Sequence, residues 1–205
     1  MMRTARLRFL PVVAALLVVA CNEPSAPEAP VAEVLSFRIF PTYAADGKSA
    51  DLIIEPSGGV FYLGKHALYF PANTICDPAI STYGPTEWDQ PCTTITQPIQ
   101  IRAELREQDG RSWIDFSPHL RFAPSEDDDR WVYLFMTTKA SEGKQMTGRN
   151  ATPILWSPAI GVPGIDESLL DETLKTKSDR KLGGVYRRIK HFSGYNVWSG
   201  FREEY

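Results

Sequence analysis

Hydrophobic and polar residues alternate along short stretches of the chain from residue 34 onward. Between Ile99 and Leu105 every second residue is apolar, while Gln100, Arg102 and Glu104 occupy the positions between them. A period of two with one polar face is typical of an antiparallel strand with one solvated side. Comparable stretches predict the following strands: Val34–Ile39, Asp51–Glu55, Val60–Leu63, Ala67–Phe70, Ile99–Leu105, Ser112–Phe116, Leu120–Phe122, Trp131–Met136, Ile154–Trp156, Val185–Lys190 and Tyr195–Trp198.

Turn residues separate these strands and favour an all-β fold. Gln108-Asp109-Gly110 lies between two predicted strands, and Asp-Gly tolerates the positive φ angles of a hairpin turn. Many short strands at regular spacing predict an antiparallel β-sandwich. Residues 166–174 have acids at the start and three leucines on a possible shared side, which predicts a helix there, with a single turn or a loop as the alternative.

The first 20 residues have the pattern of a secretory signal. Three arginines precede an apolar run from Phe9 to Ala20, which is shorter than the about 20 residues that a hydrocarbon core requires. The sequence Val18-Val19-Ala20-Cys21 resembles the lipobox of bacterial lipoproteins. The resemblance implies that residues 1–20 are removed and that Cys21 is acylated, which anchors the protein without a transmembrane helix. An ordinary signal peptide is the alternative.

The segment after Cys21 predicts a tether. Residues 22–33 are mostly Pro, Ala and Glu, and they cannot bury enough apolar surface to fold. We therefore divide the chain into a signal peptide (1–20), an acylated cysteine with its linker (21–33) and a β-sandwich domain (34–205). Asn rather than Asp at position 22 implies, by the sorting rule of Gram-negative lipoproteins, the outer membrane if the host has one.

Composition narrows the possible functions. The chain has 205 residues, of which 43% are hydrophobic and 16 are proline, so it suits one domain, or two at most, rather than a disordered chain or a coiled coil. Removal of residues 1–20 leaves 19 basic and 25 acidic residues. This acidic balance argues against a nucleic-acid partner. We expect the membrane as one partner, through Cys21, and an unidentified protein or cell-envelope component as another.

Cys76 and Cys92 form an even pair in a chain predicted to be exported. In an oxidising compartment such a pair predicts a disulfide, which contributes about 3 kcal/mol by chain entropy. A metal site is the alternative, but no histidine lies near the two cysteines. Tyr83 and Trp88 lie in the loop between them, where they form either an exposed binding patch or a lid over the core.

Four segments of the chain share features with a known domain family: Ser57–Leu63 with Ala67–Asn73, Pro98–Leu105, Phe116–Pro124 and Ile189–Tyr195. The first contains a Gly-Gly pair, the third a Ser-Pro turn and the fourth the tripeptide His-Phe-Ser. In this order and spacing they resemble the ZU-type domain (zonula occludens/uncoordinated), a β-sandwich found in ankyrins, netrin receptors and death-domain scaffolds. The resemblance covers about residues 52–198 and departs from the animal domains in the Cys76–Cys92 loop and in residues 137–180.

The tripeptide His191-Phe192-Ser193 is the candidate reactive site. In some relatives, and in unrelated nucleoporins, a His-Phe-Ser tripeptide cuts its own backbone before the serine. The resemblance implies that Ser193 is the nucleophile, His191 the base and Phe192 the carbonyl donor, with Gly194 allowing an unusual backbone. The alternative is that His191 and Ser193 merely form a hydrogen bond while Phe192 packs in the core.

Other chemistry has weaker support. Residues 126–129 are all acidic but lack the ligand spacing of a calcium loop, and the three histidines lack metal-ligand spacing, so we expect neither metal nor cofactor. Three functions follow: an anchored structural or interaction module without turnover catalysis, a domain that cleaves itself between Phe192 and Ser193, or a secreted hydrolase.

Overall fold

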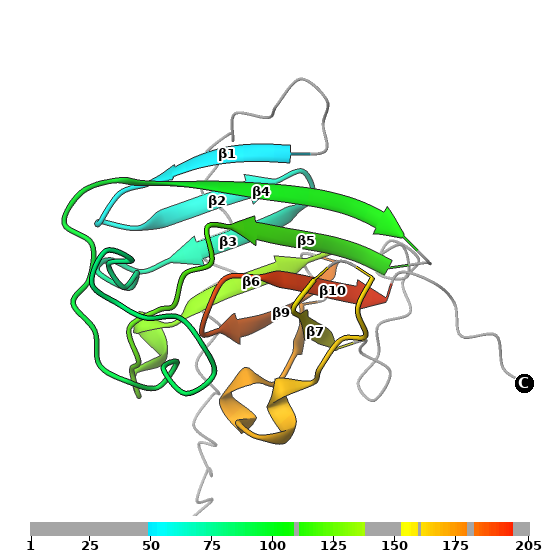
Figure 1. Cartoon of the computed structure of the whole chain (residues 1–205). Helices are drawn as coiled ribbons and strands as arrows, with labels where there is room; N and C mark the ends of the chain where they lie inside the picture. Colours follow the sequence, from blue (N-terminus) through cyan, green and yellow to red (C-terminus); the bar gives the residue numbers. More distant parts are fainter. Residues whose placement is uncertain (1–48, 109–110, 138–152, 160, 180–182, 199–205) are drawn as a thin grey trace, which may run out of the picture.

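The computed structural model describes residues 49–108, 111–137, 153–159, 161–179 and 183–198. Within these residues two antiparallel five-stranded sheets form a β-sandwich, as predicted (Figure 1). The first sheet has the order β1 (Ser49–Ile54), β4 (Ile99–Gln108), β5 (Arg111–Ser117), β10 (Gly194–Trp198), β7 (Ile154–Ser157). The second has the order β2 (Gly59–Leu63), β3 (His66–Phe70), β6 (Val132–Met136), β9 (Gly184–Ile189), β8 (Lys177–Asp179).

The core lies between the two sheets. The inward residues of β4, Ile101 and Ala103, are fully buried, while Gln100 and Arg102 are exposed, which confirms the predicted alternation. Leu68 and Leu134 meet them from the second sheet in a single apolar cluster. A smaller aromatic cluster, which includes Tyr133 and Tyr186, lies on the other face of the second sheet.

Most predicted strands are present, and three expectations need correction. Residues 166–174 form two short 3-10 helices, η3 (Glu167–Leu169) and η4 (Glu172–Leu174), instead of one amphipathic helix. Leu174 is buried, whereas Leu169 and Leu170 are exposed, so the three leucines do not share a side. Leu120–Phe122 makes isolated bridges to residues 75 and 191 rather than a strand, and β8 was not predicted.

The residues that flank the predicted Asp-Gly turn face each other: Gln108 pairs with Arg111 at the end of the β4–β5 ladder. Asp109 and Gly110 themselves lie outside the described residues. Gly58, before β2, has a φ of 74°, and a Cβ there would lie 2.1 Å from the carbonyl oxygen of Phe70, so only glycine fits. Pro71 directly follows β3 and ends its pairing.

No described helix is long and apolar enough to cross a membrane.

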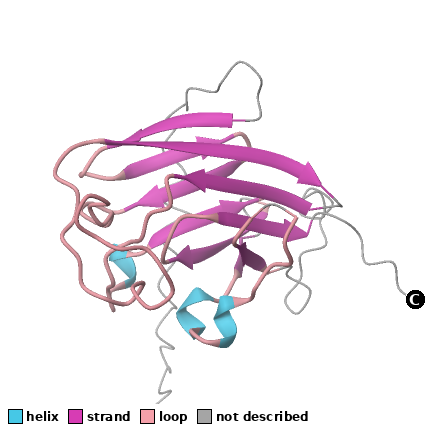
Figure 2. Cartoon of the chain, viewed as in Figure 1, coloured by secondary structure: helices cyan, strands magenta, loops and turns pink. Residues whose placement is uncertain are grey.

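The connections that contact His191 meet at one end of the sandwich. Figure 2 shows loops and 3-10 turns gathered there, below and to the left of the strands. The β9–β10 connection, the long β3–β4 connection and η3 all contact one another at this end through His191. Residues 1–48, including Cys21, the tether and the predicted strand Val34–Ile39, lie outside the described residues.

Candidate functional site

The tripeptide His191-Phe192-Ser193 forms the connection between β9 and β10. It is held by the neighbouring segment Leu120–Arg121: Arg121 pairs with His191, and the Phe192 amide donates to the Leu120 carbonyl at 2.6 Å. The Phe192 ring is fully buried and stacks on Phe116 with ring centroids 4.3 Å apart. This packing fixes the backbone of the tripeptide, because an aromatic ring in a close-packed core has little freedom to move.

The structure brings a third residue to the predicted pair. Ser193 Oγ lies 3.4 Å from His191 Nδ1, and His191 Nε2 lies 3.0 Å from Glu167 Oε1. All three side chains are at least nine-tenths buried. We refer to Ser193, His191 and Glu167 as the Ser–His–Glu centre. Its order of nucleophile, base and carboxylate is that of an activated serine, in which the carboxylate orients the imidazole.

The hydrogen bonds around His191 determine which ring nitrogen carries the proton. Glu167 Oε2 already accepts a hydrogen bond from Arg187 Nη2 at 2.8 Å, so its other oxygen is an acceptor toward His191 Nε2. A proton on Nε2 leaves Nδ1 as the free acceptor that faces Ser193. Burial lowers the pKa of His191, and Arg187 lowers it further, although Glu167 acts in the opposite direction. The ring is therefore neutral at pH 7 and can accept a proton.

Two further side chains contact Ser193, His191 and the Phe192 carbonyl. The Trp156 indole Nε1–H donates to Ser193 Oγ at 2.6 Å. With this bond occupying one lone pair, the serine proton remains available for His191 Nδ1. The Tyr83 hydroxyl donates to the Phe192 carbonyl at 2.9 Å and lies 3.3 Å from His191 Nδ1. The atoms on both sides of the Phe192–Ser193 peptide bond thus have polar contacts.

Glu167 and Arg187 form a buried ion pair that supports the centre. Arg187 lies on β9 between Val185 and Ile189, and its side chain is fully buried. Its guanidinium also donates to the Ile154 carbonyl at 2.8 Å. Because a buried charge is costly without a partner, Arg187 fixes the Glu167 carboxylate in place.

The disulfide between Cys76 and Cys92 is present, as predicted. The loop that it closes covers the site, because the Trp88 ring stacks on the His191 ring with centroids 3.7 Å apart. Of the two predictions for Tyr83 and Trp88, the lid is therefore the better description: Tyr83 is 37% exposed but its hydroxyl points inward to Phe192.

Gly194 has a different role from the one expected. It is not among the described glycines with a positive φ. A Cβ at Gly194 would lie 2.7 Å from the Ser157 carbonyl oxygen, so the close approach of β7 requires a glycine here.

The acidic residues 126–129 lie in and before a 3-10 turn, η1 (Asp128–Arg130). Within the described part of the chain, no group of metal-ligating side chains is clustered.

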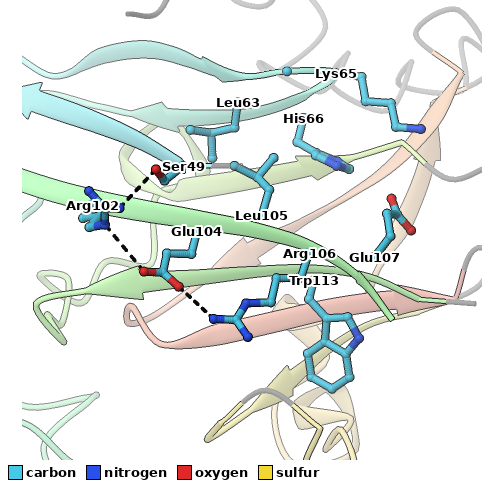
Figure 3. A pocket seen from close by; sticks show the side chains of 11 residues that line it. Ser49, Leu63, Lys65, His66, Arg102, Glu104, Leu105, Arg106, Glu107 and Trp113 are labelled. Carbon is cyan, nitrogen blue, oxygen red and sulfur yellow. Dashed lines mark hydrogen bonds and ion pairs between the residues drawn. The ribbon is translucent and has the colours of Figure 1, made fainter. Parts of the chain in front are cut away.

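A separate cleft of about 740 Å³ lies between the first sheet and the β2–β3 hairpin (Figure 3). Three of its charged side chains pair with one another: Arg102 and Arg106 both contact Glu104. His66 also lines it. None of the three residues of the Ser–His–Glu centre lines this cleft.

The His66 side chain predicts a pH dependence of stability. Burial, and secondarily Lys65, lowers the pKa of His66 to about 4, and its Nδ1 accepts the Thr137 amide at 3.2 Å, which only the neutral ring can do. The unfolded chain binds the extra proton below its pKa of 6.5. The contribution of His66 to the free energy of unfolding is therefore fully present above pH 6.5, and about 3 kcal/mol of it is lost as the pH falls toward 4.

Urea denaturation at pH 7 and pH 4 of wild type and His66→Asn checks this prediction. Asparagine can accept the same amide without titrating, so the variant should lose less stability between the two pH values. An equal loss in both proteins would contradict the assignment to His66.

The fold and the site together define a class: an all-β sandwich with a disulfide-closed loop over a buried Ser–His–Glu centre. Comparison of the chain with protein-family models, curated proteins and solved structures gives no match in any of the three.

Proposed function

We propose that this protein is an exported, lipid-anchored β-sandwich module that cuts its own backbone once, between Phe192 and Ser193. The observation that carries the proposal is the approach of His191 Nδ1 to Ser193 Oγ at 3.4 Å, with His191 Nε2 held by Glu167. A general base works at about 2.6–3.2 Å, and the contact of a resting site is commonly longer than that of the reacting state. The resemblance to the ZU-type domain supports the same cut.

The first step transfers the acyl group from nitrogen to oxygen. Ser193 Oγ gives its proton to His191 Nδ1 and bonds to the Phe192 carbonyl carbon. The carbon–nitrogen bond then breaks, and the nitrogen takes the proton from His191 to become the amine of Ser193. The Phe192 acyl group is left as an ester on Ser193 Oγ. Water hydrolyses this ester, which yields the Phe192 carboxylate and restores the serine hydroxyl.

A hydrolase that acts on a separate substrate has less support. Ser193 is 2% exposed and lies under the loop that carries Trp88. A foreign substrate cannot reach it without opening this loop, whereas the Phe192 carbonyl is covalently adjacent. Proximity of this kind replaces an encounter between two molecules.

The products are expected to stay together. The new N-terminus, Ser193, precedes β10, which pairs with both β5 and β7. Tyr195 and Val197 of β10 are fully buried. The cut module therefore keeps its fold as two chains, and an interaction role at the envelope does not depend on an intact backbone.

Export and anchoring stay a proposal from the sequence, and the disulfide supports them. Disulfides persist in oxidising compartments and are rare in the cytosol. We propose that Cys21 carries the lipid and that residues 22–33 hold the sandwich away from the membrane, which is the outer membrane if the host is Gram-negative.

Intact-mass spectrometry under denaturing conditions tests the proposal. We expect two chains from the folded wild type, with the smaller one starting at Ser193, and a single chain from Ser193→Ala. The same spectrum shows the lipid on Cys21. Ser157→Ala is a matched control, because Ser157 is also fully buried and hydrogen-bonded in the same sheet, and it should still give two chains. A wild type that stays one chain after prolonged folding would rule out the cut.

A further inference from the structure

We propose that Tyr83 is a catalytic residue of this cut: its hydroxyl stabilises the negative charge that develops on the Phe192 carbonyl oxygen when Ser193 attacks. The inference rests on the proposed self-cleavage. Tyr83 comes from the disulfide loop, 109 residues before Phe192 in the chain, so the reacting carbonyl and its donor meet only in the folded protein.

The geometry fits a donor to an oxyanion. The Tyr83 hydroxyl donates to the resting Phe192 carbonyl oxygen at 2.9 Å. It is therefore in position to stay bonded as this oxygen becomes the oxyanion, whose donors lie about 2.7–3.1 Å away. Apart from its contact with the Ser193 hydroxyl, the phenol has one proton and two acceptors in reach, the Phe192 oxygen at 2.9 Å and His191 Nδ1 at 3.3 Å. The shorter contact takes the proton, which leaves Nδ1 for the proton of Ser193.

The surroundings keep Tyr83 protonated. Burial raises the pKa of Tyr83, a hydrogen bond with Ser193 lowers it, and the negative charges of Glu167 and Asp115 raise it again. The hydroxyl is thus a neutral donor throughout the physiological range. In a site with little water, a fixed donor stabilises the developing charge more strongly than it would in solution.

Loop contacts fix Tyr83 in this position. The Arg121 guanidinium donates to the Thr82 carbonyl at 2.9 Å and to the Gln90 carbonyl at 2.6 Å, which holds both arms of the loop. Lys190 pairs with Asp89 of the loop. The Cys76–Cys92 disulfide closes the loop at its base. A donor held in this way needs no reorganisation at the moment of reaction.

The rate of cleavage in Tyr83→Phe tests the inference. The full chain is purified in denaturant, refolded by dilution under oxidising conditions, and the two-chain fraction is followed by intact mass. Loss of one oxyanion donor is expected to slow cleavage by about 10²- to 10³-fold. Tyr133→Phe is the control, because the Tyr133 ring packs in the separate aromatic cluster, and it should cleave at the wild-type rate.

The pH profile distinguishes a catalytic role from a structural one. If Tyr83 stabilises the oxyanion, Tyr83→Phe lowers the plateau rate and leaves the His191-dependent midpoint unchanged. A wild-type rate, or a lowered rate with a shifted midpoint, would overturn the inference, because the second result means that Tyr83 acts on His191. A second variant covers the case in which phenylalanine impairs folding: 3-fluorotyrosine incorporated at position 83 keeps the hydroxyl as a more acidic donor. It should cleave at least at the wild-type rate, and a large loss of rate would also overturn the inference. Failure of the wild type itself to cleave would instead refute the proposed function.

Discussion

Glu167→Gln is expected to slow the proposed cleavage between Phe192 and Ser193 by about 10²- to 10⁴-fold, the range that a general base contributes. The Glu167 carboxylate accepts from both Arg187 and His191. An amide has only one acceptor oxygen, and arginine cannot give up its proton, so the oxygen turns to Arg187. The amide N–H then faces His191 Nε2, which has to accept. The ring proton moves to Nδ1, where it blocks transfer from Ser193.

Glu172→Gln is the matched control for this prediction. Glu172 begins η4 as Glu167 begins η3, but its side chain is exposed, so its replacement should leave the rate unchanged. Both variants are compared by refolding at a temperature at which circular dichroism shows them folded. Wild-type cleavage by Glu167→Gln would mean that the carboxylate does not orient the base.

Arg187→Met is expected to reduce the free energy of unfolding by about 3–5 kcal/mol, because it leaves the Glu167 charge buried without its cation. The two side chains are 2.8 Å apart and have relative exposures of 0% and 8%. The methionine also leaves the Ile154 carbonyl without its donor. Urea denaturation in the Ser193→Ala background measures the change on a single uncut chain.

Two comparisons isolate the buried charge as the cause. Arg102→Met removes ion pairs to Asp51 and Glu104 that are about half exposed, and it should cost less than about 1 kcal/mol. Adding Glu167→Gln to Arg187→Met removes the stranded charge and should recover part of the loss. Equal losses in the two arginine variants, or no recovery in the double variant, would contradict this explanation.

Local patterns were enough to predict most of the sandwich from the sequence. The alternation in Ile99–Leu105 and the Asp-Gly turn depend on neighbouring residues, and the structure has the corresponding strand and hairpin. Of the two predictions for residues 166–174, the continuous helix was wrong and the single turn is closer to the two 3-10 turns observed. Acids and leucines satisfy a helical pattern locally, while tertiary contacts determine the backbone. Only Leu174 reaches the core, and Glu167 turns inward to Arg187.

The candidate site was only partly predictable for the same reason. His191 and Ser193 are two residues apart and could be recognised as a motif. Glu167 lies 24 residues from His191, and Tyr83 lies 109 residues from Phe192, so the fold alone brings them together. The sequence does contain a sign of the buried ion pair. Strand alternation puts Arg187 on the same face as the apolar Val185 and Ile189, and a charge on a buried face requires a counter-ion.

The position of β10 between β5 and β7 has a mechanical consequence if the chain is cut. Its ladders to β5 and β7 would then be the principal connection between the two pieces, with no covalent bond across Phe192 and Ser193. A pull along β10 would load both ladders in shear, so that their hydrogen bonds resist together and fail together. The cut sandwich would hold β10 against thermal motion and release it at a threshold force.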